Sequence, residues 1–416
     1  MNTSTIDVFF SDDIKGKKFR AVDGCGYNLE GLKKFRNEFN MWNDEIREYG
    51  YKSVNLEYKH YYNDRCATFQ IFKRFEKLSN NHKYEYEDIK SYEFLSFENC
   101  SNGGLIKLNE RYKNNIIQSY GYDFHCFYPF CLSRTDFKLA YKSGKRQKID
   151  KLDFSKLDYG TYKVKITCEN AEFRNKFCFN PSNEYTHYEL LCCHQHEALY
   201  DIKYELLDNV KYNAITYDND SLLEGKKIFG FWNRGIYDLK RKFPHNKLVK
   251  KLHSRLWGYL IEFNDVMINE YDSNMSYMNE ADKTEYKIID NNYDEEGNMI
   301  YKCVKRKNAY KTPYARIKPF LTAYARCLIT NLITKEKLDR HLIRIHTDNI
   351  TLTKKHFFKA MNNMSAEAKT TGRIEWCFAA TYYHECPKCK CLYKYYDGKI
   401  KGSNTKHSCN DKNNIK

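Results

Sequence analysis

No stretch of this sequence is both apolar enough and long enough to cross a lipid bilayer. The first residues also lack the basic-then-apolar order of a secretory signal peptide. Acidic residues are in deficit, with 54 Asp and Glu against 70 Lys and Arg, which gives a formal net charge of +16. These absences predict an intracellular protein with no membrane partner, and the charge favours a polyanionic partner. A solvated basic surface in a chain rich in Lys, Asn and Tyr is the alternative explanation of the charge.

A disulfide framework is not expected, because the 16 cysteines are scattered along an intracellular chain. Free thiols with one local metal site are predicted instead. The 416 residues, of which 42% are hydrophobic, are enough for two or three packed units. The 37 Tyr and 26 Phe offer ring faces on which bases stack, although most are expected in the core.

The distribution of apolar residues predicts a mixture of helices and strands. Enrichment in β-branched and aromatic residues predicts short strands over residues 99–210, apart from a helix over 186–200. Pro244 separates two amphipathic segments, 222–243 and 246–263, which predicts an antiparallel helical hairpin. The other expected elements are a helix over 65–75, a β-hairpin over 286–304, a helix from 312–313 to about 333, and a short strand with a polar centre over 342–350.

Two aspartates lie where predicted strands turn. Asp123 follows an apolar strand, and Asp348 lies at the apex of a strand–turn–strand segment between Leu342 and Ile350. Each aspartate alone is more typical of a turn than of a catalyst. Side by side, however, the two carboxylates would bind two Mg²⁺ ions and support in-line phosphoryl transfer.

The predicted helix over 246–263 carries a basic face. Lys247, Lys250 and Ser254 are spaced by three and four residues and therefore share one side of a helix. A lysine ammonium on this side would neutralise a triphosphate, and the small Ser254 and Gly258 would let a base pair approach. Taken by itself, the segment also fits an ordinary basic amphipathic helix.

The order of these three segments resembles that of the family B DNA polymerases, in particular the compact branch that includes protein-primed enzymes of viruses and linear plasmids. Residues 123–129 resemble the first palm motif, an Asp followed by a Ser-Leu-Tyr-Pro-like run. Residues 250–258 resemble the fingers motif, which reads Lys, three residues, Asn-Ser, one residue, Tyr-Gly. Residues 344–349 resemble the motif Tyr-x-Asp-Thr-Asp-Ser, and the whole similar region runs from about residue 102 to 375.

The resemblance implies an α+β fold with a palm built on a small antiparallel sheet, fingers formed by the helical hairpin, and a small thumb with a Cys/His zinc-like module. The implied domains are the end of a 3′–5′ exonuclease-like domain (1–98), the palm in two parts (99–210 and 264–375), the fingers (211–263), and the thumb module with its tail (376–416).

The implied function is that of a template-directed DNA polymerase, which adds dNTPs to a 3′ end by two-metal nucleotidyl transfer in viral or plasmid DNA replication. Asp123, Asp348 and the carbonyl of Phe124 would bind two Mg²⁺ or Mn²⁺ ions, and both aspartates would be catalytic. Tyr128 would exclude a 2′-hydroxyl as a steric gate, and Lys250 would contact the triphosphate. The implied contacts are with dNTP at Tyr128, Lys247, Lys250 and Ser254, and with DNA at Trp257, Gly258, Thr347, Gly372 and Arg373.

Several residues depart from the family motifs. The replacements are Cys126 for Ser in the first motif, Ser254 and Arg255 for Asn-Ser, and Trp257 for Tyr in the fingers motif, and His346 for the first Asp of the third motif. His346 removes one negative charge beside the metal ligands, which would weaken metal affinity or alter its pH dependence.

Residues 1–98 contain little that resembles a proofreading domain. Residues 60–68 resemble the last exonuclease motif, but His60 stands in place of the expected Tyr. The expectation is an exonuclease domain that is truncated or encoded in a separate chain.

A Cys/His cluster near the C-terminus has four members with zinc-ligand spacing: Cys386, Cys389, His407 and Cys409. Tetrahedral Zn²⁺ prefers such ligands, so a structural zinc is predicted, with His384 and Cys391 as alternative ligands. Free surface thiols are the other reading. The cluster Cys192–His196 is expected to be core or surface, because on a helix its members point in several directions.

Three other functions stay open. The substituted motifs fit a catalytically inactive, polymerase-derived nucleic-acid-binding protein, and the short N-terminal region fits one part of a split polymerase. An RNA-synthesising enzyme such as a primase is disfavoured by Tyr128. The expected partners are primer–template DNA and dNTPs, with a terminal protein primer or a separate exonuclease chain. The expected location is the cytoplasm, a viral factory or an organelle that carries a linear plasmid.

Overall fold

The computed structural model describes residues 83–112, 117–124, 126–243, 247–269, 286–293, 297, 299–356, 366–374, 381–385 and 392–396, together with residues 68, 69, 71–73, 75 and 76, which are helical. The chain divides into two compact units, each formed by three separate stretches. The first unit comprises Met1–Phe94, Tyr128–Ser143 and Asn219–Ile317, and the second comprises Leu95–Phe127, Gly144–Asp218 and Lys318–Lys416. The five domains expected from the sequence have other boundaries and stay a prediction.

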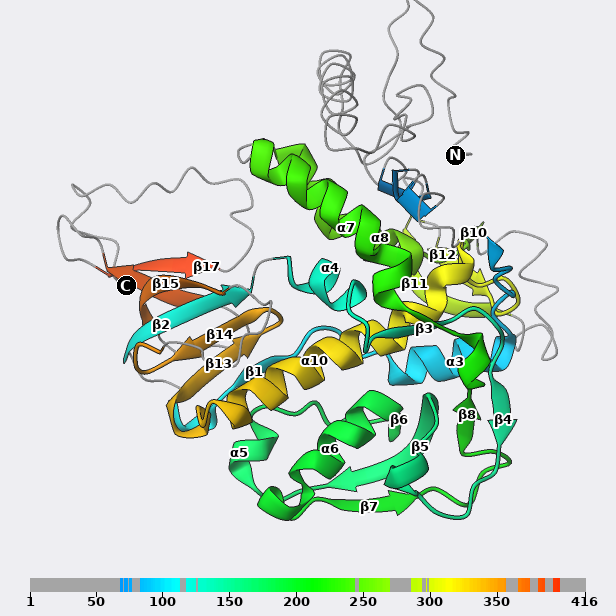
Figure 1. Ribbon diagram of the computed structural model, residues 1–416, viewed down its shortest axis with the longest axis horizontal. Helices are drawn as coiled ribbons and strands as arrows, with labels where there is room; N and C mark the ends of the chain where they lie inside the picture. Colours follow the sequence, from blue (N-terminus) through cyan, green and yellow to red (C-terminus); the bar gives the residue numbers. More distant parts are fainter. Residues whose placement is uncertain are drawn as a thin grey trace, which may run out of the picture. The chain divides into compact units, whose positions relative to one another are not determined.

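A seven-stranded antiparallel sheet dominates one end of the second unit (Figure 1), with the strand order β1-β13-β14-β2-β15-β16-β17. The strands are β1 (Ile106–Leu108), β2 (Ile117–Phe124), β13 (Leu342–His346), β14 (Asn349–Leu352), β15 (Ala366–Ile374), β16 (Thr381–Glu385) and β17 (Leu392–Tyr396). β-Branched residues favour this pleated arrangement, and Ile343, Ile345 and Ile350 are fully buried in it. The strand–turn–strand segment predicted at 342–350 is therefore confirmed as the β13–β14 hairpin.

The second unit also contains a smaller sheet covered by a helix. The sheet has the order β4-β8-β5-β6, and β7 pairs with β5. Its elements are β4 (Lys145–Gln147), β5 (Gly160–Thr167), β6 (Glu184–Thr186), β7 (Lys203–Leu206), β8 (Ala214–Thr216), α5 (Ala171–Arg174) and α6 (His187–Tyr200), with short 3₁₀ turns η3 (Glu110–Tyr112), η4 (Phe154–Lys156) and η8 (Asp339–His341). One core cluster joins β5, β6, β8, α5 and α6, and it includes Val164 of β5, Phe173 of α5 and Leu190 of α6. The predicted helix over 186–200 is confirmed as α6.

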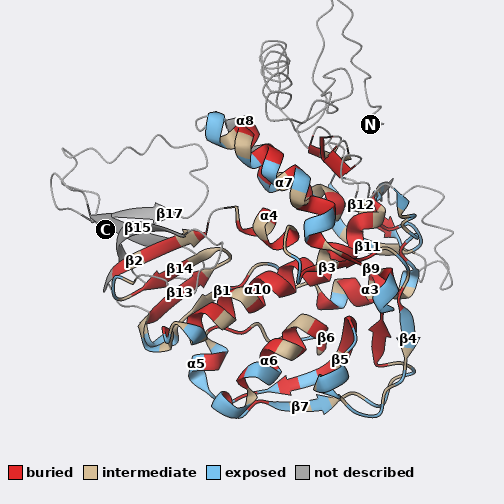
Figure 2. Ribbon diagram, in the orientation of Figure 1, coloured by how far each residue is buried: buried red, intermediate tan, exposed pale blue. Residues whose placement is uncertain are grey.

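The helix α10 (Ile317–Lys335) is buried along most of its length (Figure 2). A helix with apolar residues on all sides is typical of a protein interior. The sequence predicted one helix from 312–313, whereas a 3₁₀ turn, η7 (Pro313–Arg316), precedes α10. Thr312 and Pro313 do begin this turn, and Pro319 lies in the first turn of α10, where a missing N–H breaks no helical hydrogen bond.

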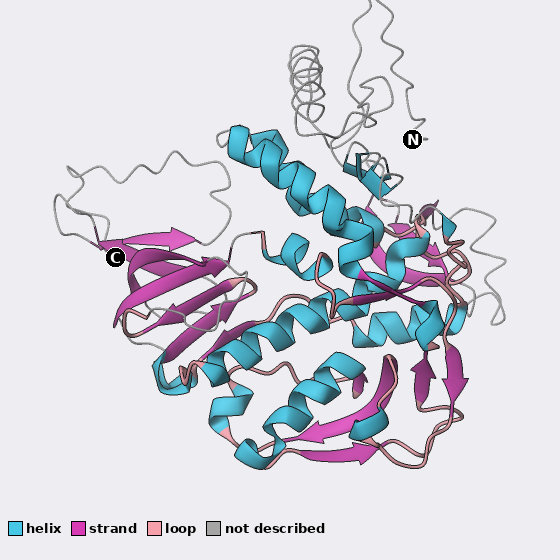
Figure 3. Ribbon diagram, in the orientation of Figure 1, coloured by secondary structure: helices cyan, strands magenta, loops and turns pink. Residues whose placement is uncertain are grey.

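The first unit contains the predicted helical hairpin, α7 (Gly225–Lys242) and α8 (Lys247–Leu260), shown as two long neighbouring helices in Figure 3. The first helix was predicted from residue 222, whereas residues 222–224 form a strand, β9. The predicted β-hairpin is also present, because β11 and β12 pair with each other and β12 pairs with β10. The other bounds are β10 (Asp265–Asn269), β11 (Tyr286–Tyr293), β12 (Met299–Lys305), β3 (Lys138–Ala140), β9 (Leu222–Glu224), η5 (Asn219–Ser221), α4 (Phe127–Leu132) and α3 (Ser91–Cys100).

The inner face of the helical hairpin is apolar except for one histidine. Trp232 and Ile236 of α7 are fully buried, and His253 of α8 lies against the Trp232 ring, 5.3 Å between centroids. Its Nε2 is 2.6 Å from Oδ1 of Asn233, so the neutral ring donates this hydrogen bond. Burial, with a smaller contribution from Lys240, lowers the pKa of His253 to about 3. The ring is therefore uncharged at neutral pH.

The start of α7 leaves no room for a side chain. A Cβ on Gly225 would lie 2.1 Å from the carbonyl oxygen of Leu132, and the Gly225 N–H donates to the Phe137 carbonyl at 2.8 Å. Glycine is thus required where α7 leaves β9 and meets the end of α4. Among the helices of the described residues, none is long and apolar enough to cross a membrane.

Candidate functional site

The two predicted catalytic aspartates lie at the same end of the seven-stranded sheet. Asp123 is the penultimate residue of β2, and Asp348 lies in the turn between β13 and β14. β14 pairs with β2, and the Phe124 N–H donates to the Asp348 carbonyl at 2.9 Å. The sequence predicted one metal site formed by Asp123, Phe124 and Asp348. The structure brings these three residues to the same end of one sheet, where β2 ends and the β13–β14 hairpin turns.

The turn that carries Asp348 has an unusual backbone. It links His346 to Asn349, which are paired across the hairpin, by the two residues Thr347 and Asp348. Thr347 has a φ of 59°, in the left-handed region that β-branched residues rarely adopt and that a two-residue turn ordinarily fills with Gly, Asn or Asp. Backbone strain of this kind costs about 1–3 kcal/mol and persists where surrounding contacts hold it in place.

The carboxylate of Asp123 is oriented by its cross-strand neighbour. Asn349 faces Asp123 in the register of β14 and β2, and its Nδ2 donates a hydrogen bond to Asp123 Oδ1. The Asn349 amide is fixed in turn by Thr351, whose Oγ1 donates to Asn349 Oδ1 at 3.0 Å. Thr351 is fully buried, so this pair forms a supporting layer beneath the carboxylate.

A third acidic residue occupies the facing position on the other side of β2. Glu367 of β15 is the register partner of Asp123, while Ala366 faces Phe124. Asp123 is thus flanked in the sheet by Asn349 on one strand and Glu367 on the next. Glu367 was not predicted from the sequence, where it is an isolated acidic residue between two alanines.

In the first unit, the residues predicted to bind nucleotide and DNA on the second helix of the hairpin all lie in α8. Lys250, Ser254 and Gly258 are exposed, and Ser254 Oγ donates to the Lys250 carbonyl at 3.1 Å. A Cβ on Gly258 would have no atom within 4 Å, so the surface there is open. Lys247 is the first residue of α8. The basic face that the spacing predicted is therefore a solvent-facing side of this helix at Lys250 and Ser254.

Tyr128, the predicted steric gate, contacts the aromatic residue of the fingers-like motif. Its ring lies 5.0 Å from that of Trp257, with 33° between the planes. Tyr128 belongs to α4, a short helix that the sequence did not predict. Cys126, with a φ of 51°, turns the chain between β2 and this helix. The Trp that replaces the family's Tyr thus keeps an aromatic surface against Tyr128.

The remaining predicted residues are placed in part. Gly372 and Arg373 lie in β15, opposite Ser119 and Gln118 of β2, just after an irregularity in the pairing. Thr347 lies in the β13–β14 turn, as described above. The four predicted zinc ligands (Cys386, Cys389, His407 and Cys409) lie outside the described residues, as does the exonuclease-like segment at 60–67.

The cysteine- and histidine-rich part of α6 is mostly interior. Cys192, Cys193 and His196 are buried, and His196 Nδ1 is 2.7 Å from the Cys192 carbonyl, whereas His194 is exposed and 2.9 Å from Glu197. Burial lowers the pKa of His196. Among the described residues, no group of three or more Asp, Glu, His and Cys side chains is placed to bind a metal ion.

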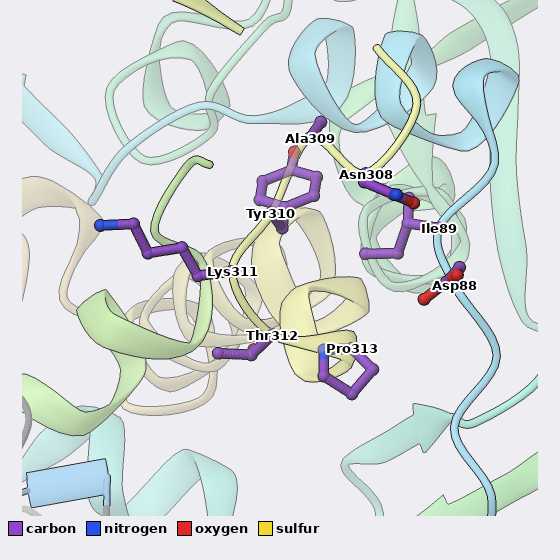
Figure 4. Close-up of a pocket in the computed structure, with 8 residues that line it drawn as sticks. All are labelled: Asp88, Ile89, Asn308, Ala309, Tyr310, Lys311, Thr312 and Pro313. Carbon is purple, nitrogen blue, oxygen red and sulfur yellow. The ribbon is translucent and has the colours of Figure 1, made fainter. Parts of the chain in front are cut away.

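A cavity of about 160 Å³ lies in the first unit and is shown in Figure 4. Its lining residues are Asp88, Ile89, Asn308, Ala309, Tyr310, Lys311, Thr312 and Pro313. The polar groups of this wall already serve the fold. The Asp88 carbonyl accepts a hydrogen bond from Arg316 at 2.9 Å, and Lys311 pairs with Glu262 at 3.0 Å. None of the residues predicted to act in catalysis lines it.

Comparison with solved structures shows that the chain has a polymerase-like fold. The matching structures are of phi29 DNA polymerase: the ternary complex with primer–template DNA and incoming nucleotide, the complex with single-stranded DNA, and the post-translocation binary complex with primer–template DNA. The sequence identity is 15% in each case, and the TM-scores are 0.55, 0.51 and 0.51. At this identity, the likeness establishes the fold alone.

These matches cover 81%, 83% and 81% of this chain but 60%, 57% and 57% of the polymerase chain. The chain therefore spans less than two thirds of the length of phi29 DNA polymerase. No protein-family profile matches the sequence, and no curated protein matches it.

Proposed function

We propose that this chain is a template-directed DNA polymerase that adds dNTPs to the 3′ end of a primer. The observation that carries the proposal is the position of Asp123 near the end of β2 and of Asp348 in the adjoining β13–β14 turn, with the Phe124 N–H bonded to the Asp348 carbonyl. The fold likeness to phi29 DNA polymerase, whose structures contain primer–template DNA and incoming nucleotide, supports the same conclusion.

The donor groups at this edge of the sheet suit hard divalent cations. The carboxylates of Asp123 and Asp348 and the carbonyl of Phe124 are oxygen ligands of the kind that Mg²⁺ and Mn²⁺ prefer, and Glu367 is the register partner of Asp123. Two cations bound there would supply Lewis-acid activation of the 3′-hydroxyl and charge neutralisation at the leaving pyrophosphate. The two aspartates would hold the ions, and Asn349 would keep the Asp123 carboxylate oriented.

Other residues of the chain would position the substrates. Lys250, which is exposed on α8, would contact the triphosphate, while Tyr128 would lie beneath the sugar with its ring supported by Trp257. The net charge of +16 favours binding of the DNA backbone, since each phosphate contact releases counterions. Synthesis of DNA in a virus or linear plasmid, from a terminal protein or a nucleic-acid primer, belongs to the same proposal.

A second function has two specific observations in its favour. Asn349 already donates a hydrogen bond to Asp123, which occupies one oxygen of that carboxylate. His346 stands two positions before Asp348, where the family motif has an acidic residue, and so removes one negative charge. A catalytically inactive, polymerase-derived protein that binds nucleic acid is therefore the alternative.

A primer-extension assay with Mg²⁺ and with Mn²⁺ distinguishes the two functions. The wild-type chain should extend a primer, and Asp123→Asn or Asp348→Asn should slow extension by about 10³-fold or more, equal to about 4 kcal/mol of activation free energy. Primer–template binding should persist in both variants. Asp218→Asn is the matched control, because Asp218 is an exposed aspartate paired with Lys145. Extension by either variant at the wild-type rate would exclude the proposed site, and DNA binding without extension by the wild type would favour the alternative.

A structural zinc is also proposed for the C-terminal Cys/His cluster: Cys386, Cys389, His407 and Cys409. It would stabilise a small thumb module and take no part in the chemistry. Metal analysis of the purified chain should find one zinc per molecule, and Cys389→Ser should remove it. A zinc-free protein with unchanged stability would contradict this assignment.

A further inference from the structure

A buried arginine of the second unit connects three separate parts of the chain. Arg326 of α10 is 4% exposed, and its Nη2 donates to Oε1 of Glu189 in α6 at 2.6 Å. Its Nη1 donates to two successive backbone carbonyls, those of Asn102 and Gly103, the latter at 2.6 Å. Glu189 is itself held, because its Oε2 accepts hydrogen bonds from the N–H and the hydroxyl of Thr186 at 2.9 and 3.1 Å.

The segment that Arg326 holds lies directly against the turn that carries Asp348. The Thr347 N–H donates to the Leu105 carbonyl at 2.8 Å. A Cβ on Gly104 would lie 2.5 Å from Oγ1 of Thr347, so only glycine allows this close approach. Beyond Gly104 and Leu105 the chain enters β1, which pairs with β13 on the same hairpin.

The turn needs such external support for a physical reason. Thr347 holds a left-handed conformation, and the cost of that backbone has to be met by surrounding contacts. Two of these contacts come from residues 104 and 105, one as a hydrogen bond and one as close packing. If residues 102–105 were free to move, they would supply neither contact reliably. The Arg326 guanidinium restricts this movement, because it holds the carbonyls of Asn102 and Gly103.

We propose that Arg326, set by Glu189, is a positioning residue for the Asp123–Asp348 pair. It fixes residues 102–105, which hold the Thr347 turn, and the turn sets the Asp348 carbonyl against the Phe124 N–H. This inference rests on the proposed polymerase function for its catalytic readout, but not for its structural one.

The experiment compares two buried arginines of similar burial. Arg326→Met removes the positioning group. Arg326→Lys keeps the charge but has a single nitrogen, so it cannot bind the two carbonyls and Glu189 through the separate Nη1 and Nη2 positions that Arg326 uses. The control is Arg316→Met, since Arg316 is also fully buried and paired with a carboxylate, Glu93, but belongs to the first unit, where it binds Glu87, Asp88 and Ser143. Gly104→Ala perturbs the same path from its other end, and Gly103→Ala, whose Cβ would meet no atom within 4 Å, should have a weaker effect.

Two readouts are taken at a temperature at which every variant is folded. In primer extension, Arg326→Met and Gly104→Ala should lower kcat by about 10–100-fold, the usual range for residues that orient metal ligands, with KM for dNTP and primer–template binding unchanged. Arg326→Lys should recover part of the loss. In hydrogen exchange measured by mass spectrometry, the peptide that contains Thr347 should exchange about tenfold faster in Arg326→Met than in wild type. Arg316→Met should change neither readout.

The two readouts separate failure of this inference from failure of the proposed function. A wild-type chain without primer extension would refute the polymerase proposal, while the exchange of the Thr347 peptide would still test the link to Arg326. Unchanged exchange in a folded Arg326→Met variant would overturn the inference. It would also be overturned if Arg326→Met and Arg316→Met lowered kcat equally, because the effect would then follow loss of stability alone.

Discussion

Arg316 and Glu93 form a buried ion pair in the first unit. Replacing only one of the two residues should lower the stability of the folded chain strongly. Both side chains are fully buried, and Arg316 binds the carboxylate through Nε and Nη2, each at 3.0 Å. The same guanidinium donates to the carbonyls of Glu87 and Asp88 at 2.6 and 2.9 Å and to Ser143 Oγ at 3.2 Å. Arg316→Met therefore removes the counter-charge of a buried carboxylate and one donor from each of two carbonyls.

Removing one member of a buried pair costs about 3–5 kcal/mol, because the desolvated charge that remains has no compensation. For a urea dependence of about 2 kcal/mol per M, a loss of 4 kcal/mol moves the unfolding midpoint by about 2 M. The measurement is urea unfolding followed by tryptophan fluorescence, since Trp232 is buried in the same unit. Arg316→Met combined with Glu93→Gln should cost less than the sum of the two single variants, because the double variant leaves no unpaired charge.

Lys145→Met provides the control for this measurement. Lys145 and Asp218 are 2.6 Å apart, but both side chains are more than half exposed, at 64% and 54%. Loss of such a surface pair should cost less than about 1 kcal/mol. A shift of the urea midpoint by Arg316→Met that is no larger than the shift by Lys145→Met would contradict this prediction. Strictly additive effects of Arg316→Met and Glu93→Gln would contradict it as well.

Three further outcomes are expected. Stability should fall with acidification below pH 6.5 by up to about 1.4 kcal/mol per pH unit, because His253 has a pKa of about 3 in the folded chain and is protonated first in the unfolded chain. In His253→Asn, the free energy of urea unfolding should depend less on pH between pH 5 and 7 than in the wild type. Gly235→Ala should destabilise the chain by about 1–3 kcal/mol, since its Cβ would lie 2.5 Å from the buried Phe75 ring. Gly230→Ala in the same helix should stabilise the chain by up to about 1 kcal/mol, and equal melting temperatures of the two variants would contradict this difference. Tyr128→Val should raise rNTP incorporation relative to dNTP in primer extension, and an unchanged ratio would remove the steric-gate role.

Local patterns predicted most of the long elements. Apolar spacing and Pro244 predicted the α7–α8 hairpin, alternation predicted β11 and β12, and the helix α6 begins at the Thr186 position that the sequence indicated. The short helix α4 was not predicted, because five of its six residues are aromatic, Pro or Cys rather than good helix formers, and it follows a left-handed Cys126. The order of strands in the large sheet was not predicted, since pairing between distant segments leaves no local period.

Of the residues at the candidate site, Asp123 and Asp348 were predicted, and their neighbours were not. The two aspartates were singled out because they lie where predicted strands turn, and the order of three motifs then gave them a shared role. Asn349 and Arg326 bind partners 226 and 137 positions away, at Asp123 and Glu189, and Glu367 is the register partner of Asp123 at a separation of 244 positions. These pairings can be recognised only when the register of the sheet and the packing of α10 are known.

The pairing of β2 with β14 also has a consequence for biosynthesis. Asp123 and Asn349 are separated by 226 positions, and at about 5–20 residues per second a ribosome needs on the order of 10–50 s to make the chain between them. Until then, β2 has neither β14 nor the later β15 beside it, so its edges are open to wrong partners. The nascent chain should therefore depend on chaperones during this interval, and the end of the sheet that carries Asp123 and Asp348 should acquire its native structure late.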